Sequence, residues 1–253
     1  MSDARRRVIG VIPARLASTR LPRKVLRTLA GESLLAWVYR AAKACPELYE
    51  VIVAADSMEV QQLCDRQGWP CVLTSPDLPS GTDRVFAVSR VVDAEIYVNI
   101  QGDEPLLQPE HVAAILGPFA MPEVDVTTLK VRCTVENVDN PHAVKVVTAA
   151  DGRALYFSRA AIPFDREGTG EAVYWKHLGL YAYRRSALER FAALVPSPLE
   201  QTERLEQLRL LENGIALYVA ETEHDTIGVD MEEDLRRVEA ILLERWRSKA
   251  YRC

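Results

Sequence analysis

Short runs of apolar residues alternate with amphipathic stretches along the first 100 residues. The runs are continuous and rich in β-branched residues, which is typical of strands that are buried on both faces. We predict strands at 8–12, 50–55, 70–74 and 95–101, and helices at 33–45, 57–68 and about 83–91. Strands that alternate with helices in this way indicate a parallel sheet built from βαβ units.

The pattern changes after about residue 125, where longer strands follow one another with fewer helices between them. We predict a more mixed sheet from strands at 125–132, 143–150, 154–157 and 177–184, followed by helices at 205–214 and about 231–246. No Pro-, Gly- or Ser-rich linker separates the two halves, so we expect one domain over residues 1–253.

Composition narrows the class of protein. Hydrophobic residues make up 48% and charged residues 26% of 253, and the net charge is −5, so no general basic excess favours a nucleic-acid partner. Five scattered cysteines without a C-x-x-C pair favour reduced thiols in the cytosol. The apolar run at 8–12 is too short for a signal peptide and no run is long enough for a membrane helix, so we expect a cytoplasmic protein.

The loop after the first strand is strongly basic. Eight Lys or Arg residues and no acid lie between Ala4 and Gly31. A polyphosphate requires converging cations and backbone N–H donors, and arginine grips phosphate oxygens with two donors at once. The stretch matches neither G-x-x-x-x-G-K-[ST] nor G-x-G-x-x-G. It is either a solvated basic turn or a phosphate-binding loop.

Two acidic residues are candidate metal ligands, and each has a structural alternative. Asp103 follows the central strand in "GDEP", at the sheet edge where ligands bind, and it either helps to hold Mg²⁺ or closes its own turn. Asp230 lies in "GVDMEEDL", where it is either a second metal ligand or, with Glu233, the capping box of the last helix.

Further polar residues are candidates for binding a nucleoside or a sugar acid, and each has a structural alternative. "SGTDR" (80–84) is a small-residue turn whose backbone can approach a base or ribose, and Asp83 is the expected start of the next helix. Arg159 is either a carboxylate ligand or a surface ion-pair partner. His177, Glu206 and Gln207 either line a pocket for a polyhydroxylated acid or are satisfied polar residues on half-buried elements.

Taken in order, eight motifs resemble the 3-deoxy-manno-octulosonate cytidylyltransferase (CMP-Kdo synthetase) family over nearly the whole chain. They are "VIGVIPARLASTRLPRK", "SGTDR", "YVNIQGDEPL", "NPHAVKVV", "ALYFSRAAIPFDR", "KHLGLYAY", "PLEQTERLEQLRLLENG" and "GVDMEEDL". The resemblance implies a nucleotide-diphospho-sugar transferase-like (Rossmann-like) α/β fold with a mostly parallel sheet and a smaller mixed α/β sugar-binding and dimerisation lobe. It implies a homodimer that joins CTP and Kdo with Mg²⁺, giving CMP-Kdo and pyrophosphate for lipopolysaccharide synthesis.

The resemblance also assigns regions and residues. Residues of about 1–130 and 215–253 form the nucleotide-binding part, and about 131–214 form the sugar-binding and dimer lobe. The residues assigned to CTP are Arg15, Ser18, Arg20, Lys24, Ser80, Gly81, Thr82 and Gln101, and those assigned to Kdo are Arg159, His177, Tyr181, Glu206 and Gln207. Asp103 and Asp230 are implied as Mg²⁺ ligands, and together with Lys24 and Arg15 they form the implied catalytic set.

Two positions depart from the family pattern. Arg23 stands where the family commonly has glycine, so we expect it at the surface, and Leu78 stands where a histidine is common before S-G-T. Two alternatives remain open: a cytidylyltransferase for a related acid sugar, 8-amino-Kdo or sialate, and a nucleotide-binding sensor without turnover. The presence of Asp103, Asp230 and Lys24 together favours an enzyme.

Overall fold

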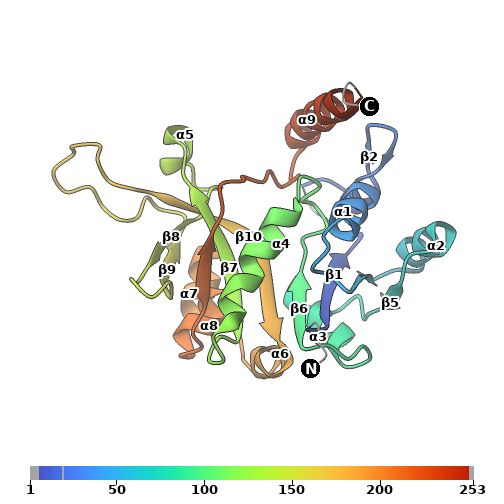
Figure 1. Ribbon diagram of the computed structural model, residues 1–253, viewed down its shortest axis with the longest axis horizontal. Helices are drawn as coiled ribbons and strands as arrows, with labels where there is room; N and C mark the ends of the chain where they lie inside the picture. The colour runs from blue at the N-terminus through green and yellow to red at the C-terminus, as the bar shows by residue number, and fades with distance from the viewer. Residues whose placement is uncertain (1–5, 19, 251–253) are drawn as a thin grey trace, which may run out of the picture. The chain divides into compact units, whose positions relative to one another are not determined.

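The computed structural model describes residues 6–18 and 20–250, apart from the side chains of 246–250. It divides into two compact units, which are drawn in Figure 1. Unit 1 comprises Met1–Pro109 and Thr226–Cys253, and unit 2 comprises Glu110–Asp225. The chain thus leaves the first unit and returns to it, so the last helix belongs with the N-terminal strands.

Unit 1 contains a parallel sheet, as predicted. Its strands, in spatial order, are β6 (Ile96–Asn99), β1 (Val8–Ala14), β4 (Glu50–Ala55) and β5 (Cys71–Leu73). Each neighbouring pair runs parallel. β1 lies between β6 and β4 and is buried along almost its whole length, which explains its continuous apolar sequence. The loops after these strands leave from the same edge of the sheet.

The helices of unit 1 follow the predicted pattern with one correction. Their bounds are α1 (Leu34–Lys43), α2 (Met58–Gln67), α3 (Gly81–Ser89) and α9 (Glu232–Ala250). Ser57 caps α2 by accepting from the Val60 N–H, and Gly68 ends it with a φ of 69°, so the helix predicted at 57–68 is confirmed. α3 begins earlier than expected. Its N-cap is Ser80, which accepts from the Asp83 N–H, so the prediction that Asp83 starts the helix was wrong.

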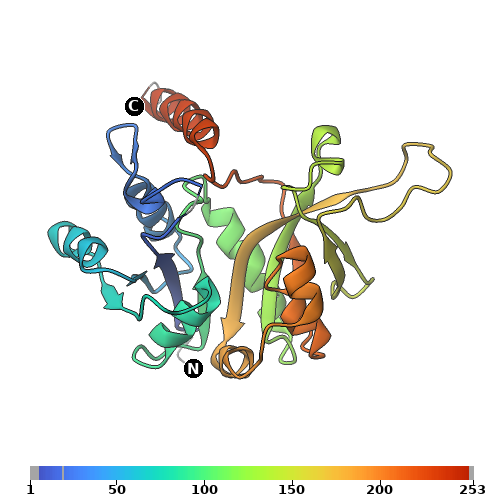
Figure 2. The same ribbon diagram turned by 180° about the vertical axis from the view of Figure 1, so that it is seen from behind.

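α9 packs on the N-terminal part of the chain. The short strands β2 (Thr28–Leu29) and β3 (Glu32–Ser33) precede α1, and α9 lies beside them in Figures 1 and 2. A buried apolar cluster joins α9 to β2, to α1, and to the loops that follow β1 and β6. Its members are Leu21, Leu29, Leu34, Leu106, Val229, Leu235, Val238 and Leu242, with Ile241 packed against it. The helix predicted at about 231–246 therefore presents an apolar stripe of Leu235, Val238, Ile241 and Leu242 to this cluster. The side chain of Trp246, on the same helix, lies outside the described residues.

Unit 2 has the mixed sheet that the sequence predicts. Its strands are β7 (Val126–Arg132), β8 (Lys145–Thr148), β9 (Ala154–Ser158), β10 (Trp175–Arg184) and β11 (Tyr218–Glu221). β10 pairs antiparallel with β7 and β8, β8 pairs antiparallel with β9, and β11 runs parallel to β7. The register of β10 shifts between Leu178 and Tyr181, so an irregularity lies beside His177 and Tyr181, two residues that the family resemblance assigns to the sugar.

Helices cover both faces of the unit 2 sheet. α4 (Pro109–Leu116) lies in front of β7 and β10 in Figure 1, and α7 (Pro198–Glu203) and α8 (Leu208–Glu212) lie in front in the reverse view of Figure 2. α8 is shorter than the predicted helix at 205–214. The remaining elements are the helices α5 (Val135–Val138) and α6 (Arg185–Ala192) and the 3-10 turns η1 (Lys24–Leu26) and η2 (Gly117–Ala120).

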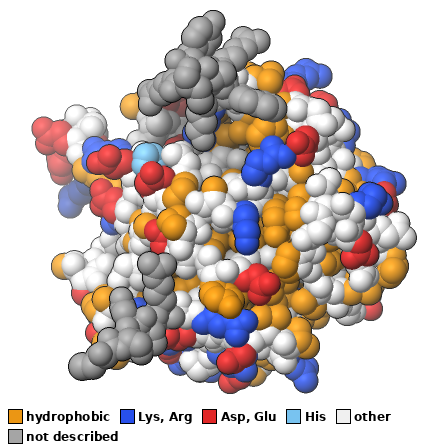
Figure 3. Space-filling view, turned by 45° about the vertical axis from the view of Figure 1, so that its right-hand side comes forward, with side chains coloured by type: hydrophobic (Ala, Val, Ile, Leu, Met, Phe, Trp, Pro, Cys, Tyr) orange, Lys and Arg blue, Asp and Glu red, His pale blue; other side chains and the backbone are white. Residues whose placement is uncertain are grey.

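The surface carries charges of both signs. Basic and acidic side chains are interspersed with apolar ones on the face shown in Figure 3. Within the described part of the chain, no helix has the length and apolar character required to span a membrane.

Candidate active site

The basic loop leaves β1 and is fixed to the sheet by its backbone. The Leu16 N–H donates to both carboxylate oxygens of Asp56, each at 3.2 Å, and Asp56 itself follows β4. Further on, Ser18 Oγ accepts from the Leu21 N–H at 3.4 Å, which closes a turn. Arg15 and Arg20 are exposed. The loop therefore presents cationic side chains from an anchored backbone, as a phosphate-binding loop requires.

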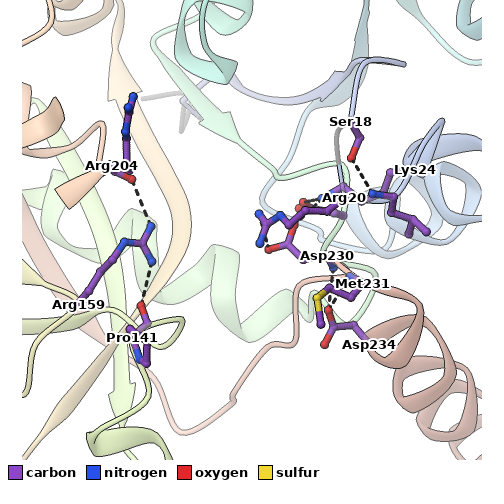
Figure 4. A network of polar contacts seen from close by, with 11 residues as sticks. Ser18, Arg20, Lys24, Pro141, Arg159, Arg204, Asp230, Met231 and Asp234 are labelled. Atoms are coloured by element: carbon purple, nitrogen blue, oxygen red, sulfur yellow. Dashed lines mark hydrogen bonds and ion pairs between the residues drawn. The ribbon is translucent and has the colours of Figure 1, made fainter. Parts of the chain in front are cut away.

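Lys24 brings together two acids that lie far apart in the sequence. Its Nζ lies 2.5 Å from Asp103 Oδ2 and 2.9 Å from Asp230 Oδ1. The Lys24 side chain is 15% exposed, whereas those of Asp103 and Asp230 are 28% and 42% exposed. Arg20 adds a second cation, with Nη2 3.0 Å from Asp230 Oδ2. Figure 4 shows Arg20 and Lys24 around Asp230.

Asp103 and Asp230 stabilise the protonated form of Lys24. Burial alone lowers the pKa of Lys24, but the charges of Asp103 and Asp230 and their hydrogen bonds outweigh burial, so the pKa is raised above its ordinary value. Lys24 is therefore a permanent cation at neutral pH. A group of two acids and two cations in one place can bind both phosphate oxygens and a divalent metal.

The structure excludes one of the two interpretations of Asp230, the capping box. Its carboxylate contacts Lys24 and Arg20, whereas the N–H groups of Asp230 and Met231 donate to Asp234 Oδ2 at 3.0 and 2.8 Å. Asp234 thus satisfies the donors at the start of α9. The alternative in which Asp230 and Glu233 form a capping box was wrong, because a tertiary contact takes the Asp230 side chain away from the helix.

The turn that carries Asp103 is packed tightly against β1. A Cβ on Gly102 would lie only 2.7 Å from the carbonyl oxygen of Pro13, so a larger residue would displace this turn. The Glu104 N–H donates to the Gln101 carbonyl, and the Val229 N–H donates to the Asp103 carbonyl. Asp103 is therefore part of a turn and also a member of the charged cluster. Backbone hydrogen bonds close this turn, the Asp103 carboxylate contacts Lys24, and the metal role of Asp103 stays a prediction.

The residues of "SGT" lie at the start of α3, next to β1 and β6. Ser80 is the N-cap, and Thr82 is buried with its Oγ1 3.5 Å from Asn99 Nδ2. A Cβ on Gly81 would lie 3.6 Å from the Pro13 ring and 3.7 Å from Asn99 Nδ2. Ser80, Gly81 and Thr82 are thus placed by packing near the carboxyl ends of two central strands, where they can approach a ligand with their backbone.

The two departures from the family pattern have different consequences. Arg23 has a φ of 57°, which is the left-handed region where glycine is unstrained, and its exposed side chain forms an ion pair with Glu59. The expectation that Arg23 lies at the surface is confirmed. Leu78 is half-buried, and its N–H donates to the Ser75 carbonyl in the loop that leads to α3.

Arg159, in unit 2, is held by backbone carbonyls. Its three guanidinium nitrogens donate to the carbonyl oxygens of Glu203, Pro141 and Arg204 at 2.7, 2.9 and 3.3 Å, and its N–H donates to the Glu203 carboxylate. Figure 4 shows the contacts to Pro141 and Arg204. In this arrangement Arg159 fastens the turn after α7, and it is not the surface ion pair of the structural alternative.

His177 and Tyr181 lie together in β10. His177 is buried, with Nε2 2.9 Å from Thr128 Oγ1, and its ring centroid is 5.5 Å from that of Tyr181. Burial, together with the nearby charge of Lys176, lowers the pKa of His177 to about 3. His177 is therefore neutral at physiological pH. It can donate or accept a hydrogen bond but does not supply a positive charge.

Glu206 and Gln207 follow the turn that Arg159 fastens. Gln207 precedes α8 and is 5% exposed, and its Nε2 has no hydrogen-bond partner among the described residues. A buried amide donor without a partner is costly, so this atom is well suited to a ligand oxygen. Glu206 is half-buried, and its carbonyl accepts from the Arg209 N–H.

The donor set fits a magnesium ion better than a transition metal. Within the part of the chain that the structure describes, no three His, Cys, Asp or Glu side chains converge as a metal site. Two carboxylates, Asp103 and Asp230, converge on one cationic group. Mg²⁺ is commonly bound by one or two carboxylates together with substrate phosphates, which matches this pair.

Sequence reasoning missed two residues of the site region, Asp56 and Arg84. Asp56 holds the basic loop by its backbone, and Arg84 is buried on α3 beside it. For Asp56 a signal was available, because it directly follows the predicted strand at 50–55 at the sheet edge where ligands bind. For Arg84 the helical pattern gave no sign that its side chain points inward.

Comparisons with known proteins show the family to which the chain is similar. A family model described as "Cytidylyltransferase" matches residues 9–223. A 3-deoxy-manno-octulosonate cytidylyltransferase from Acidobacterium capsulatum is 63% identical over 238 residues, which cover 94% of this chain and 97% of the relative. The enzyme of the same name from Koribacter versatilis is 56% identical over 239 residues, which cover 94% of this chain and 91% of the relative.

Solved structures point the same way. A structure of CMP:2-keto-3-deoxy-manno-octonic acid synthetase complexed with CTP matches with a TM-score of 0.90 at 39% identity, over 94% of this chain and 99% of that one. A cytidylyltransferase from Leptospira borgpetersenii matches with a TM-score of 0.58 at 13% identity, which shows a shared fold alone. The fold is that of the nucleotide-diphospho-sugar transferases, as expected.

Proposed function

Because this chain belongs to the 3-deoxy-manno-octulosonate cytidylyltransferase family, we propose that it transfers CMP from CTP to Kdo, giving CMP-Kdo and pyrophosphate. The activity is that of a CTP-dependent nucleotidyltransferase, and its product serves lipopolysaccharide synthesis. The observation that carries the proposal is the convergence of Lys24, Asp103 and Asp230, since these residues come from three distant parts of the sequence.

In the proposed reaction the anomeric 2-hydroxyl of Kdo attacks the α-phosphorus of CTP, and pyrophosphate leaves in line. Phosphoryl-type transfer depends chiefly on positioning and on stabilising charge. Arg15, Arg20 and Lys24 supply positive charge to the departing pyrophosphate from a loop whose backbone is held by Asp56. Ser18, Ser80–Thr82 and Gln101 are proposed to bind CTP because the family resemblance assigns them to it.

Magnesium is proposed as the cofactor, with Asp103 and Asp230 as the residues that hold it. When bound, Mg²⁺ neutralises phosphate charge and helps to orient the reacting groups. Lys24 contacts the same two carboxylates. We infer that its ammonium keeps these acids paired in the free protein and is available to phosphate oxygens when CTP and metal bind.

The sugar-binding residues are proposed to lie in unit 2. Gln207 offers a buried donor without a partner, and His177 and Tyr181 lie beside each other in β10. Arg159 holds the turn that precedes Glu206 and Gln207. We propose that residues of about 1–130 and 215–253 bind the nucleotide and that about 131–214 bind Kdo and form a homodimer contact. A cytoplasmic location is proposed because it supplies both substrates.

A pyrophosphate-release assay with CTP and a panel of sugar acids tests this function. Kdo should be turned over in the presence of Mg²⁺, with loss of activity in excess chelator and recovery when Mg²⁺ is restored. If kcat/KM for 8-amino-Kdo or sialate were similar to that for Kdo, the assignment of Kdo as the substrate would be contradicted. If no acid were turned over, the result would favour the alternative of a nucleotide-binding sensor without turnover. The family names of its relatives do not favour either alternative.

A further inference from the structure

Arg84 is buried in unit 1 and contacts the loop after β5. Its side chain is 2% exposed. Nη1 donates to Thr74 Oγ1 and to the Ser75 carbonyl, each at 2.8 Å, and Nη2 donates to the Pro76 carbonyl at 3.3 Å. Arg84 therefore ties helix α3 to the three residues that follow β5.

Asp56 connects the same arginine to the basic loop. Its Oδ2 lies 3.9 Å from Arg84 Nη2, and its side chain is 8% exposed. Both of its oxygens accept from the Leu16 N–H, and its own N–H donates to the Ala14 carbonyl at 3.2 Å. Through Asp56 and Arg84, the loops that follow β1, β4 and β5 are joined to the start of α3.

Arg84 and Asp56 place two charges in the protein interior, which packing alone does not require. A buried guanidinium is costly unless a carboxylate and several acceptors satisfy it, and here both conditions hold. Burial lowers the pKa of Arg84, while Asp56 raises it and Arg15 lowers it, so the three charges act on one another. Arginine nevertheless stays charged at neutral pH, because its ordinary pKa is so high.

We propose that Arg84 and Asp56 are positioning residues for CTP, which act by fixing the backbone at Leu16 and therefore the directions of Arg15, Ser18 and Arg20. This inference rests on the proposed function, since it assumes that the basic loop binds the CTP phosphates. The planar fork of arginine reaches three acceptors and the Asp56 carboxylate together, which a lysine ammonium does not reproduce.

Two variants test the pair from opposite sides. Arg84→Lys keeps the charge but loses the fork, and Asp56→Asn keeps an oxygen for Leu16 but removes the carboxylate charge that faces Arg84. We expect each to weaken CTP binding, measured by calorimetry without sugar, by about tenfold or more, with KM for CTP raised and kcat at saturating CTP within about threefold. Arg90→Lys, at the exposed end of the same helix, is the matched control and should bind CTP as the wild type does.

Further measurements separate positioning from folding. Hydrogen exchange at the Leu16 amide should accelerate in both variants while the amides of β1 stay protected. The double variant should bind CTP no more weakly than the single variant with the lower CTP affinity, because both changes break the same connection. Folded variants with wild-type CTP affinity and wild-type exchange at Leu16 would overturn the inference. If the wild-type protein itself does not bind CTP, the proposed function fails instead.

Discussion

Removal of the Lys24 ammonium is expected to destabilise the protein, although we propose an active-site role for this residue. In Lys24→Met the stem keeps its packing, but Asp103 and Asp230 lose the cation that lies 2.5 and 2.9 Å from them. Breaking a fully buried ion pair costs about 3–5 kcal/mol, and an exposed pair contributes about 0–1 kcal/mol. Because Asp230 is 42% exposed and Asp103 is 28% exposed, we expect a loss of about 2 kcal/mol, mostly from Asp103.

Urea unfolding measures this loss as a lower midpoint with an unchanged slope. Lys43→Met, at the exposed end of α1, is the matched control and should change stability by no more than about 0.5 kcal/mol. Mg²⁺ alone should stabilise Lys24→Met more than the wild type, since the metal no longer competes with the ammonium for the two carboxylates. A variant as stable as the wild type, with an equal response to Mg²⁺, would refute the reasoning.

Four further outcomes are expected. Asp103→Asn and Asp230→Asn should each keep the fold and lose about 100-fold or more in turnover, with Asp230→Asn losing about 1 kcal/mol or less of stability in urea; normal turnover in either would remove its assigned role. Arg23→Gly should raise the free energy of unfolding by about 0.5–1 kcal/mol, and so raise the urea midpoint, because glycine adopts the left-handed backbone without strain. A lower midpoint would contradict this. Gly102→Ala should cost about 1–3 kcal/mol and reduce turnover, and unchanged kinetics would show that the turn tolerates the methyl group. His177 is neutral when folded but takes a proton below about pH 6.5 when unfolded, so as the pH falls toward 3 the wild type should lose about 1 kcal/mol per pH unit more than His177→Gln, and parallel curves would contradict the low pKa.

The strand-and-helix pattern of unit 1 was predictable because local physics determines it. Continuous apolar runs become strands in a covered parallel sheet, and Ser57 and Gly68 delimit α2 through hydrogen bonding and backbone conformation. The strand-end rule also placed the basic loop and "GDEP" at one edge of the sheet. These features depend on neighbours in the sequence and on the parallel topology alone.

The pairing of distant side chains was not predictable from the residues by themselves. Asp230 has the local pattern of a capping box, but its carboxylate contacts Lys24, which lies 206 positions away, and Asp234 satisfies the helix. Arg84 has no local sign of its inward direction, and the carbonyls that hold Arg159 come from segments that the sequence does not pair. The metal role of the two acids and the homodimer stay predictions.

The most direct test of the central claim is the product stoichiometry with CTP, Kdo and Mg²⁺, with pyrophosphate measured enzymatically and the nucleotide product identified by mass spectrometry. Transfer of CMP to Kdo predicts one CMP-Kdo for each pyrophosphate, and no pyrophosphate when Kdo is omitted. Pyrophosphate release at the same rate without Kdo, with CMP as the nucleotide product, would show hydrolysis of CTP and contradict the account.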